Sequence, residues 1–152
     1  MVELERLGQL PREGGTYVLH LHLPAAAPIR AGRLGHWWLA AGVYLYIGSA
    51  LGPGGVRARV RRHACGSSRA HWHIDALLGE ARLAGVCYLA DGERWEHHWA
   101  HEILAEADTA IPIPGFGASD CHCPAHLVRD RAAVTLAGRQ ARLRTASGRA
   151  VG

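Results

Sequence analysis

A basic segment in the first half of the chain carries side chains suited to phosphate chemistry. Residues 56–64 read VRARVRRHA, and at about 100° per residue Arg59 and His63 fall on one face of a helix. A guanidinium can donate two parallel hydrogen bonds to a phosphate and stays charged at neutral pH. An imidazole can exchange a proton near neutrality. An amphipathic helix with a solvated basic face gives the same pattern, so the segment alone supports both interpretations.

The segment before this helix is predicted to be a strand that carries phenols. In residues 42–50, GVYLYIGSA, apolar residues alternate with Tyr44, Tyr46 and Gly48, which is the period of a half-buried strand. Residues 16–23 alternate in the same way and carry Tyr17. We expect these two strands to pair antiparallel. Strand tyrosines usually pack a sheet, but a phenol beside a cation can also orient or deprotonate water.

A third element supplies a carboxylate. Residues 93–107 have the strongest helical pattern of the chain, and Glu96 lies in line with the apolar face formed by Trp99, Ile103 and their neighbours. A carboxylate in line with a buried face should be paired, protonated or bound to a metal, because desolvating it alone is costly. The other interpretation is a solvated first-turn glutamate stabilised by the helix dipole.

A cysteine- and histidine-rich segment forms a second candidate site. Cys121, Cys123 and His126 are suitable Zn²⁺ ligands, and a tetrahedral site needs one more, for which His71, His73 and Cys65 are candidates. A buried cysteine pair with an exposed His126 is the alternative. On a helix Asp75 would face His71 and could orient its ring. Residues 71–75 could line a nucleic-acid groove or help to shape the core.

Taken in order, these features resemble the GIY-YIG endonuclease pattern. Gly15-Thr16-Tyr17 stands for the first element and Tyr46-Ile47-Gly48 for the second, followed by Arg59 and His63. More narrowly, the chain is similar to small Uri-type domains of that superfamily over roughly residues 14–128. The matching stretches are residues 32–35, 44–50, 59–63, 71–75 and 115–123.

The resemblance implies an α/β fold, a small GIY-YIG-like sandwich with a three-stranded, mainly antiparallel sheet flanked by helices. It implies phosphodiester hydrolysis with Mg²⁺ or Mn²⁺ on Glu96, charge stabilisation by Arg59, and proton handling by the phenols and His63. The phenols would need a lowered pKa to act as bases. The family asparagine after the carboxylate helix has no counterpart, since the chain contains no Asn, and Ser119, Asp120 and His122 are the candidate replacements. The implied catalytic set is Tyr17, Tyr46, Arg59, His63 and Glu96, and the implied DNA-binding set is Arg57, Arg61, Arg62, His71 and His73.

Size and composition fit one domain with a modest attraction for polyanions. The chain has 152 residues and a net charge of +4 with neutral histidines. We expect an N-terminal segment over 1–13, a nuclease domain over 14–130 and a partly disordered Arg/Ala/Gly-rich extension over 131–152. No signal peptide or membrane-spanning run is evident, which favours a cytoplasmic protein.

Two further functions remain open on the sequence. One is a catalytically weak nucleic-acid-binding module of the same fold, stabilised by Zn²⁺ at the cysteine-rich segment. The other is a hydrolase of a different substrate class that uses the histidine-rich surface, supported only by the 11 histidines. Cleavage of single-stranded, duplex or branched DNA is the leading hypothesis.

Overall fold

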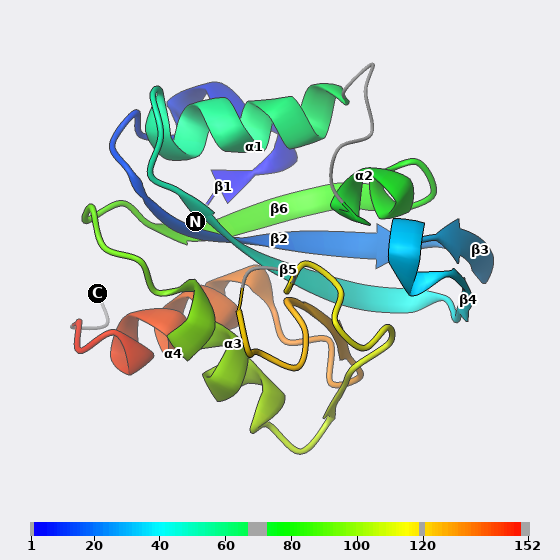
Figure 1. The fold of residues 1–152 in the computed structure, drawn as a ribbon. Coiled ribbons are helices and arrows are strands. Elements are labelled where there is room, and N and C mark those ends of the chain that lie inside the picture. The colour runs from blue at the N-terminus through cyan, green and yellow to red at the C-terminus, as the bar shows by residue number, and fades with distance from the viewer. Residues whose placement is uncertain (1, 67–72, 119–120, 150–152) are drawn as a thin grey trace.

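The fold is known from a computed structural model that describes residues 2–66, 73–118 and 121–149. It is an α/β structure built on a six-stranded sheet in the order β1-β6-β2-β5-β8-β7, in which every neighbouring pair is antiparallel. Helices cover both faces of this sheet (Figure 1). No helix among the described residues is both long and apolar enough to cross a bilayer.

Two of the three central strands are those predicted from the alternating residues 16–23 and 42–50. β2 (Gly15–Leu23) pairs along its whole length with β5 (Gly42–Ala50), with Tyr17 opposite Gly48 and Leu19 opposite Tyr46. β6 (Arg82–Leu89) pairs with the other edge of β2. The antiparallel pairing of the two tyrosine-bearing strands is therefore confirmed.

The expectation of a three-stranded sheet is wrong in strand number. β1 (Val2–Glu3) extends the sheet beside β6, whereas β8 (Leu127–Asp130) and β7 (Thr109–Ala110) extend it beyond β5. These strands have four residues or fewer, which is too short for a clear alternating pattern. A separate hairpin joins β3 (Ala27–Arg30) to β4 (His36–Leu39), with the 3-10 helix η2 (Gly32–Leu34) between them.

One face of the sheet is covered by α1 (Gly55–Cys65), the 3-10 helix η1 (Leu4–Gln9) and α2 (His73–Leu78). Val56 and Val60 of α1 join the buried core on this side, together with the inward-facing leucines of β2. His63 is the fourth buried residue of α1, after Gly55, Val56 and Val60, whereas Ala64 is exposed. This places an imidazole in the interior of the α1 face.

The opposite face is covered by α3 (Glu96–Leu104) and α4 (Leu136–Ala146), as Figure 1 shows. Trp99 and Ile103 of α3 and Leu143 of α4 pack there against Val18, and against Leu45 and Ile47 of β5. Residues 136–146 were expected to belong to a partly disordered extension and instead form a helix capped by Thr135, whose side chain accepts a hydrogen bond from the Gly138 N–H.

Candidate active site and metal-binding cluster

A buried pair of side chains connects β2 with α1. The hydroxyl of Tyr17 lies 2.8 Å from Nε2 of His63, and both residues are almost fully buried. Gly48 makes room for the phenol, because a Cβ at this position would lie 2.4 Å from the Tyr17 hydroxyl. The glycine of the Tyr46-Ile47-Gly48 element is thus required by packing against the tyrosine of the facing strand.

Arg59 and Tyr46 complete this group. Arg59 donates a hydrogen bond from Nη1 to the Ser49 carbonyl at 3.2 Å, and its guanidinium also hydrogen-bonds Tyr17. The Tyr46 ring meets the His63 ring edge-on, with 6.1 Å between centroids. Four of the five predicted catalytic residues therefore share one contiguous group, the phenol–imidazole group (Tyr17, Tyr46, Arg59 and His63).

The phenols in this group are poor bases. Burial, with a smaller contribution from the Glu96 charge, raises the pKa of Tyr46 to about 12 against an opposing effect of Arg59. Burial also raises the pKa of Tyr17 far above its ordinary value, and Tyr46 adds to this rise, against an opposing effect of Arg59. The lowered pKa that the phenols would need to act as bases is not provided by the protein groups alone, because desolvation outweighs the guanidinium.

His63 is correspondingly hard to protonate. Burial lowers its pKa to about 4, the Arg59 charge lowers it further, and Asp75 acts in the opposite direction. At neutral pH the Tyr17–His63 pair is therefore neutral. When the imidazole carries its proton on Nδ1, the Tyr17 hydroxyl donates to His63 Nε2.

Glu96 approaches from the opposite face of the sheet. It begins α3, and its side chain is 13% exposed. One carboxylate oxygen lies 3.6 Å from His126 Nδ1, and the other lies 3.4 Å from Arg94 and 3.7 Å from His97. Its alignment with the buried face of the helix agrees with the sequence prediction.

The link between Glu96 and the phenols runs through His126 and Gly117. A Cβ on Gly117 would lie 3.0 Å from the Tyr46 ring and 3.2 Å from the Cβ of His126, so these two side chains flank the glycine. The His126 carbonyl accepts a hydrogen bond from the Ile47 N–H at 2.9 Å, which holds this residue against the edge of β5. The charge of Glu96 raises the pKa of both phenols. Glu96 is thus a neighbour of the phenol–imidazole group, with His126 between them.

A cavity of 190 Å³ opens beside Arg59 at the β5–α1 connection. It is lined by Arg59, Arg62 and the small residues of the connecting turn. A larger cavity of 540 Å³ lies between the C-terminal half of α3 and α4, away from the phenols. Of these two cavities, the smaller one is adjacent to the phenol–imidazole group through Arg59.

The predicted DNA-binding arginines divide into two kinds. Arg61 and Arg62 are exposed on α1. Arg57 instead donates a hydrogen bond from Nε to the Leu10 carbonyl at 2.6 Å and so anchors the N-terminal segment. Arg57, predicted to bind DNA, is thus half-buried and its Nε–H is used within the protein.

Of the two histidines in residues 71–75, the structure describes His73. His71 lies outside the described residues, as do Ser119 and Asp120. Nδ1 of His73 accepts a hydrogen bond from the Gly117 N–H at 3.1 Å, and its ring lies 5.4 Å from that of Phe116. His122, the third candidate replacement for the absent asparagine, is exposed.

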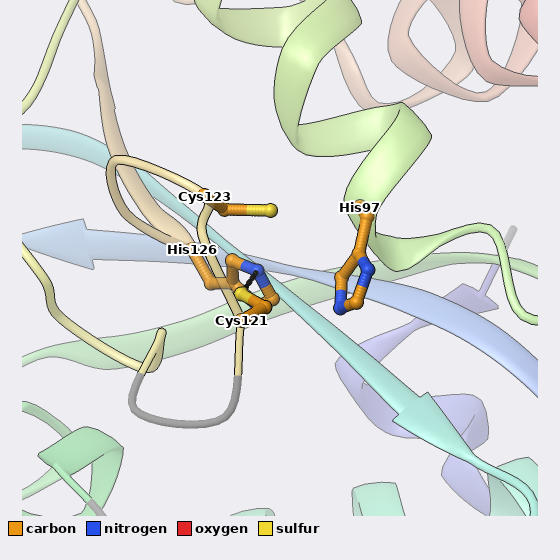
Figure 2. Close-up of side chains that lie close together, drawn as sticks. All are labelled: His97, Cys121, Cys123 and His126. Atoms are coloured by element: carbon orange, nitrogen blue, oxygen red, sulfur yellow. Dashed lines mark hydrogen bonds between the residues drawn. The ribbon is translucent and has the colours of Figure 1, made fainter.

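A second group of side chains, the Cys/His cluster, lies beside Glu96. It consists of His97, Cys121, Cys123 and His126, whose ligand atoms all lie within 4.8 Å of one another. Figure 2 shows His97 approaching from the first turn of α3 toward the three residues of the β7–β8 segment. The distance from Cys121 Sγ to His126 Nε2 is 3.3 Å.

The cluster corrects the predicted ligand set at one position. His73, named as a zinc ligand from the sequence, is not in the cluster, and His97 takes that place. Cys65 is exposed on α1 and also lies outside it. The sequence prediction missed His97 because it is on the exposed side of its helix and distant in sequence from the cysteines. The sequence feature that could have pointed to His97 as a ligand is its position next to Glu96.

Comparison with known proteins identifies the family. Residues 16–146 match the family model described as Domain of unknown function DUF123, and the chain belongs to this family. The match extends through α4, beyond the residue 130 boundary expected from the sequence. The chain matches no curated protein and no solved structure.

Proposed function

We propose that this protein is a divalent-metal-dependent endonuclease of the GIY-YIG type that hydrolyses DNA phosphodiester bonds. The proposal is carried by one observation, the contact of Tyr17 with His63 at 2.8 Å in the same group as Arg59 and Tyr46. These are the residues that the family resemblance assigns to catalysis. They come from two strands and a helix, so chance proximity in sequence does not explain their grouping.

Arg59 is the proposed phosphate-binding group. It borders the 190 Å³ cavity, where the turn between β5 and α1 presents no bulky side chain. In hydrolysis a water oxygen bonds to phosphorus while an ester P–O bond breaks, and negative charge grows on the phosphoryl oxygens. A fixed guanidinium stabilises that charge without reorganisation.

Tyr17 and Tyr46 orient the attacking water in this proposal. Their raised pKa values keep them protonated, so they position water by hydrogen bonding and do not remove its proton in the resting state. His63, neutral at pH 7, accepts from Tyr17 and fixes the direction of the phenol O–H. A proton released by water can pass through the phenol to the imidazole only as the phosphate charge develops.

Glu96 fits a hard cation such as Mg²⁺ or Mn²⁺. Its side chain is 13% exposed, and the nearby nitrogens of Arg94, His97 and His126 lie 3.4–3.7 Å from its oxygens, which leaves lone pairs for a metal. One carboxylate suffices because Mg²⁺ usually keeps several water ligands. When bound, the metal would polarise the phosphate and stabilise the leaving oxygen.

A panel of labelled single-stranded, duplex and flap DNA, incubated with Mg²⁺, Mn²⁺ or EDTA, tests the proposal. We expect metal-dependent cleavage that falls about 10²–10³-fold in Arg59→Ala, the range for removing one preorganised donor. Glu96→Gln should abolish the metal-dependent cleavage. Cys65→Ser and Glu102→Gln are controls at exposed positions of the same helices. Cleavage that persists in Glu96→Gln, or is absent on every substrate, rejects the enzyme.

A second candidate is a nucleic-acid-binding module without useful catalysis. The observation that favours it is the set of side chains around the Glu96 carboxylate, since nitrogens of Arg94, His97 and His126 lie 3.4–3.7 Å from its oxygens. In that case Glu96 serves to orient His126. Metal-independent DNA binding with no cleavage in the same panel would support this module.

A further inference from the structure

We propose that His97, Cys121, Cys123 and His126 bind a structural Zn²⁺ that joins the β7–β8 segment to the first turn of α3. The inference stands on the Cys/His cluster alone and does not depend on nuclease activity. Two thiols and two imidazoles are the donor set that selects tetrahedral Zn²⁺ among common metals. Hard ions such as Mg²⁺ prefer oxygen ligands, so this site and Glu96 would take different metals.

The separations fit one tetrahedral ion. Usual Zn–S and Zn–N bond lengths give ligand–ligand distances of roughly 3.3–3.8 Å. The Cys121 Sγ–His126 Nε2 distance is 3.3 Å, and the remaining pairs lie within 4.8 Å. Small side-chain rotations therefore bring all four donors to one centre.

Both cysteines are available as ligands. None of the four cysteines of the chain forms a disulfide bond. Cys121 and Cys123 are half-buried and lie near each other in the β7–β8 segment (Figure 2). Zn²⁺ binding would release the two thiol protons to solvent as thiolates form. Four protein ligands leave no open position, which is the form of a structural site.

His126 connects the proposed zinc to Glu96. Its Nε2 faces Cys121, while its Nδ1 lies 3.6 Å from a Glu96 oxygen. A zinc-bound imidazole usually donates its other N–H to a carboxylate or carbonyl, which fixes its tautomer and orientation. Glu96 would thus be a positioning residue for the zinc site. The zinc in turn would hold the segment that carries Gly117 against Tyr46.

In this fold the proposed zinc would attach the irregular β7–β8 segment to the regular helix α3. The segment between β7 and β8 contains two proline-containing stretches, and backbone hydrogen bonds from Gly115 to Pro124 and from His126 to Phe116 are its internal ties. Cys121 and Cys123 lie within this segment, whereas His97 belongs to a regular helix packed on the sheet. A metal shared between them anchors an irregular segment to a rigid element.

Elemental analysis of the full chain, purified without a metal-binding tag, tests the proposal directly. We expect about one zinc ion per chain. The double variant Cys121→Ser/Cys123→Ser should lose it, whereas Cys65→Ser, on the exposed part of α1, should retain it. His97→Gln should lose zinc, and His101→Gln, an exposed histidine of the same helix, should not.

A chelator titration guards against variants that fail to fold. In wild-type protein a strong zinc chelator should lower the melting temperature, and added Zn²⁺ should restore it; Cys65→Ser should behave in the same way. Glu96→Gln should keep the ion but bind it about 10–100-fold more weakly, a readout independent of DNA cleavage. Wild-type protein that takes up no zinc after dialysis against it, or zinc that remains in the double cysteine variant, overturns the proposal.

Discussion

His63 is enclosed by side chains that resist its protonation. Tyr17 of β2 and Tyr46 of β5 cover its ring, Arg59 and Arg62 of α1 repel a proton, and Asp75 of α2 attracts one. Burial dominates this balance and lowers the pKa to about 4. The imidazole is therefore a permanent hydrogen-bond partner of Tyr17 at physiological pH and does not act as a pH switch there.

This environment predicts an acid-sensitive fold. Because the folded pKa of about 4 lies below the usual value near 6.5, the unfolded chain binds the extra proton between these pH values. His63 therefore contributes stability that is complete above pH 6.5 and is lost as the pH falls toward 4. The loss is on the order of 3 kcal/mol. Urea unfolding at pH 7 and pH 5 should show a smaller pH dependence in His63→Gln than in wild type; equal dependence would contradict the pKa.

Gly117 lies between Tyr46 of the phenol–imidazole group and His126 of the Cys/His cluster. It has φ +71, and an added Cβ would meet Tyr46 at 3.0 Å and His126 at 3.2 Å. Gly117→Ala should cost about 1–2 kcal/mol for the left-handed backbone and a further 1–3 kcal/mol for crowding. Gly115→Ala is the matched control, since its φ is +81 but its nearest neighbour is a Leu34 methyl at 3.4 Å. Chemical denaturation of both variants checks this, and equal losses would mean that crowding at Gly117 is relieved.

At the scale of elements, a buried ion cluster fixes α4 to the sheet. Arg139 of α4 is 1% exposed and pairs with Asp130 of β8 at 3.1 Å and with Glu106. Asp130 also accepts hydrogen bonds from the N–H groups of Ala132 and Val134, which shape the turn into the helix. A helix with a weak apolar face is thus held by charge pairing as well as by Leu143.

Removing the buried member of this cluster should be far more damaging than removing an exposed one. Arg139→Met leaves Asp130 buried without its partner and should cost about 3–5 kcal/mol of unfolding free energy. Arg142→Met is the control, because Arg142 pairs with the same Glu106 but is 56% exposed, and should cost less than about 1 kcal/mol. Urea midpoints distinguish the two. Similar losses would show that α4 is held mainly by its apolar contacts.

The contrast between α4 and β2 explains which elements can be predicted from sequence. β2, β5, α1 and α3 have enough residues for a clear apolar period, and each was predicted near its observed position. α4 was missed because its inward side includes Arg139, whose partners are Asp130 of β8 and Glu106 in the turn after α3. A buried arginine is indistinguishable in sequence from the exposed arginines around it.

The candidate site was predictable in its residue types and less so in its contacts. The order of Tyr17, Tyr46, Arg59 and His63 indicated one group because strand pairing and the next helix must bring them together. The rise in phenol pKa and the choice of His97 over His73 depend on burial and on loop path, which are tertiary properties. Arg57 shows the same limit, since only the folded N-terminal segment gives it a partner.

At the scale of the whole molecule, side chains from the two faces of the sheet come close together near the end of β5. The phenol–imidazole group lies on the α1 face, whereas Glu96 and the Cys/His cluster belong to the α3 face. His126, at the edge of β5, contacts both sides through Gly117 and Glu96. A DNA strand that reaches Arg59 and Glu96 together would therefore cross this edge, with exposed Arg61 and Arg62 on the α1 side.

Such a path predicts a specific dependence of DNA affinity on salt. Each arginine that neutralises a backbone phosphate contributes about 0.9 to the slope of log K against log salt for duplex DNA and about 0.7 for a single strand. The slope should therefore fall by about that amount per residue in Arg61→Gln and Arg62→Gln, with little change in base preference. Arg57→Gln should leave the slope unchanged and reduce stability, because its partner is the Leu10 carbonyl. Fluorescence anisotropy at several salt concentrations measures this. An unchanged slope in both Arg61→Gln and Arg62→Gln would place the DNA on another surface, because exposed cations along its path must release counterions.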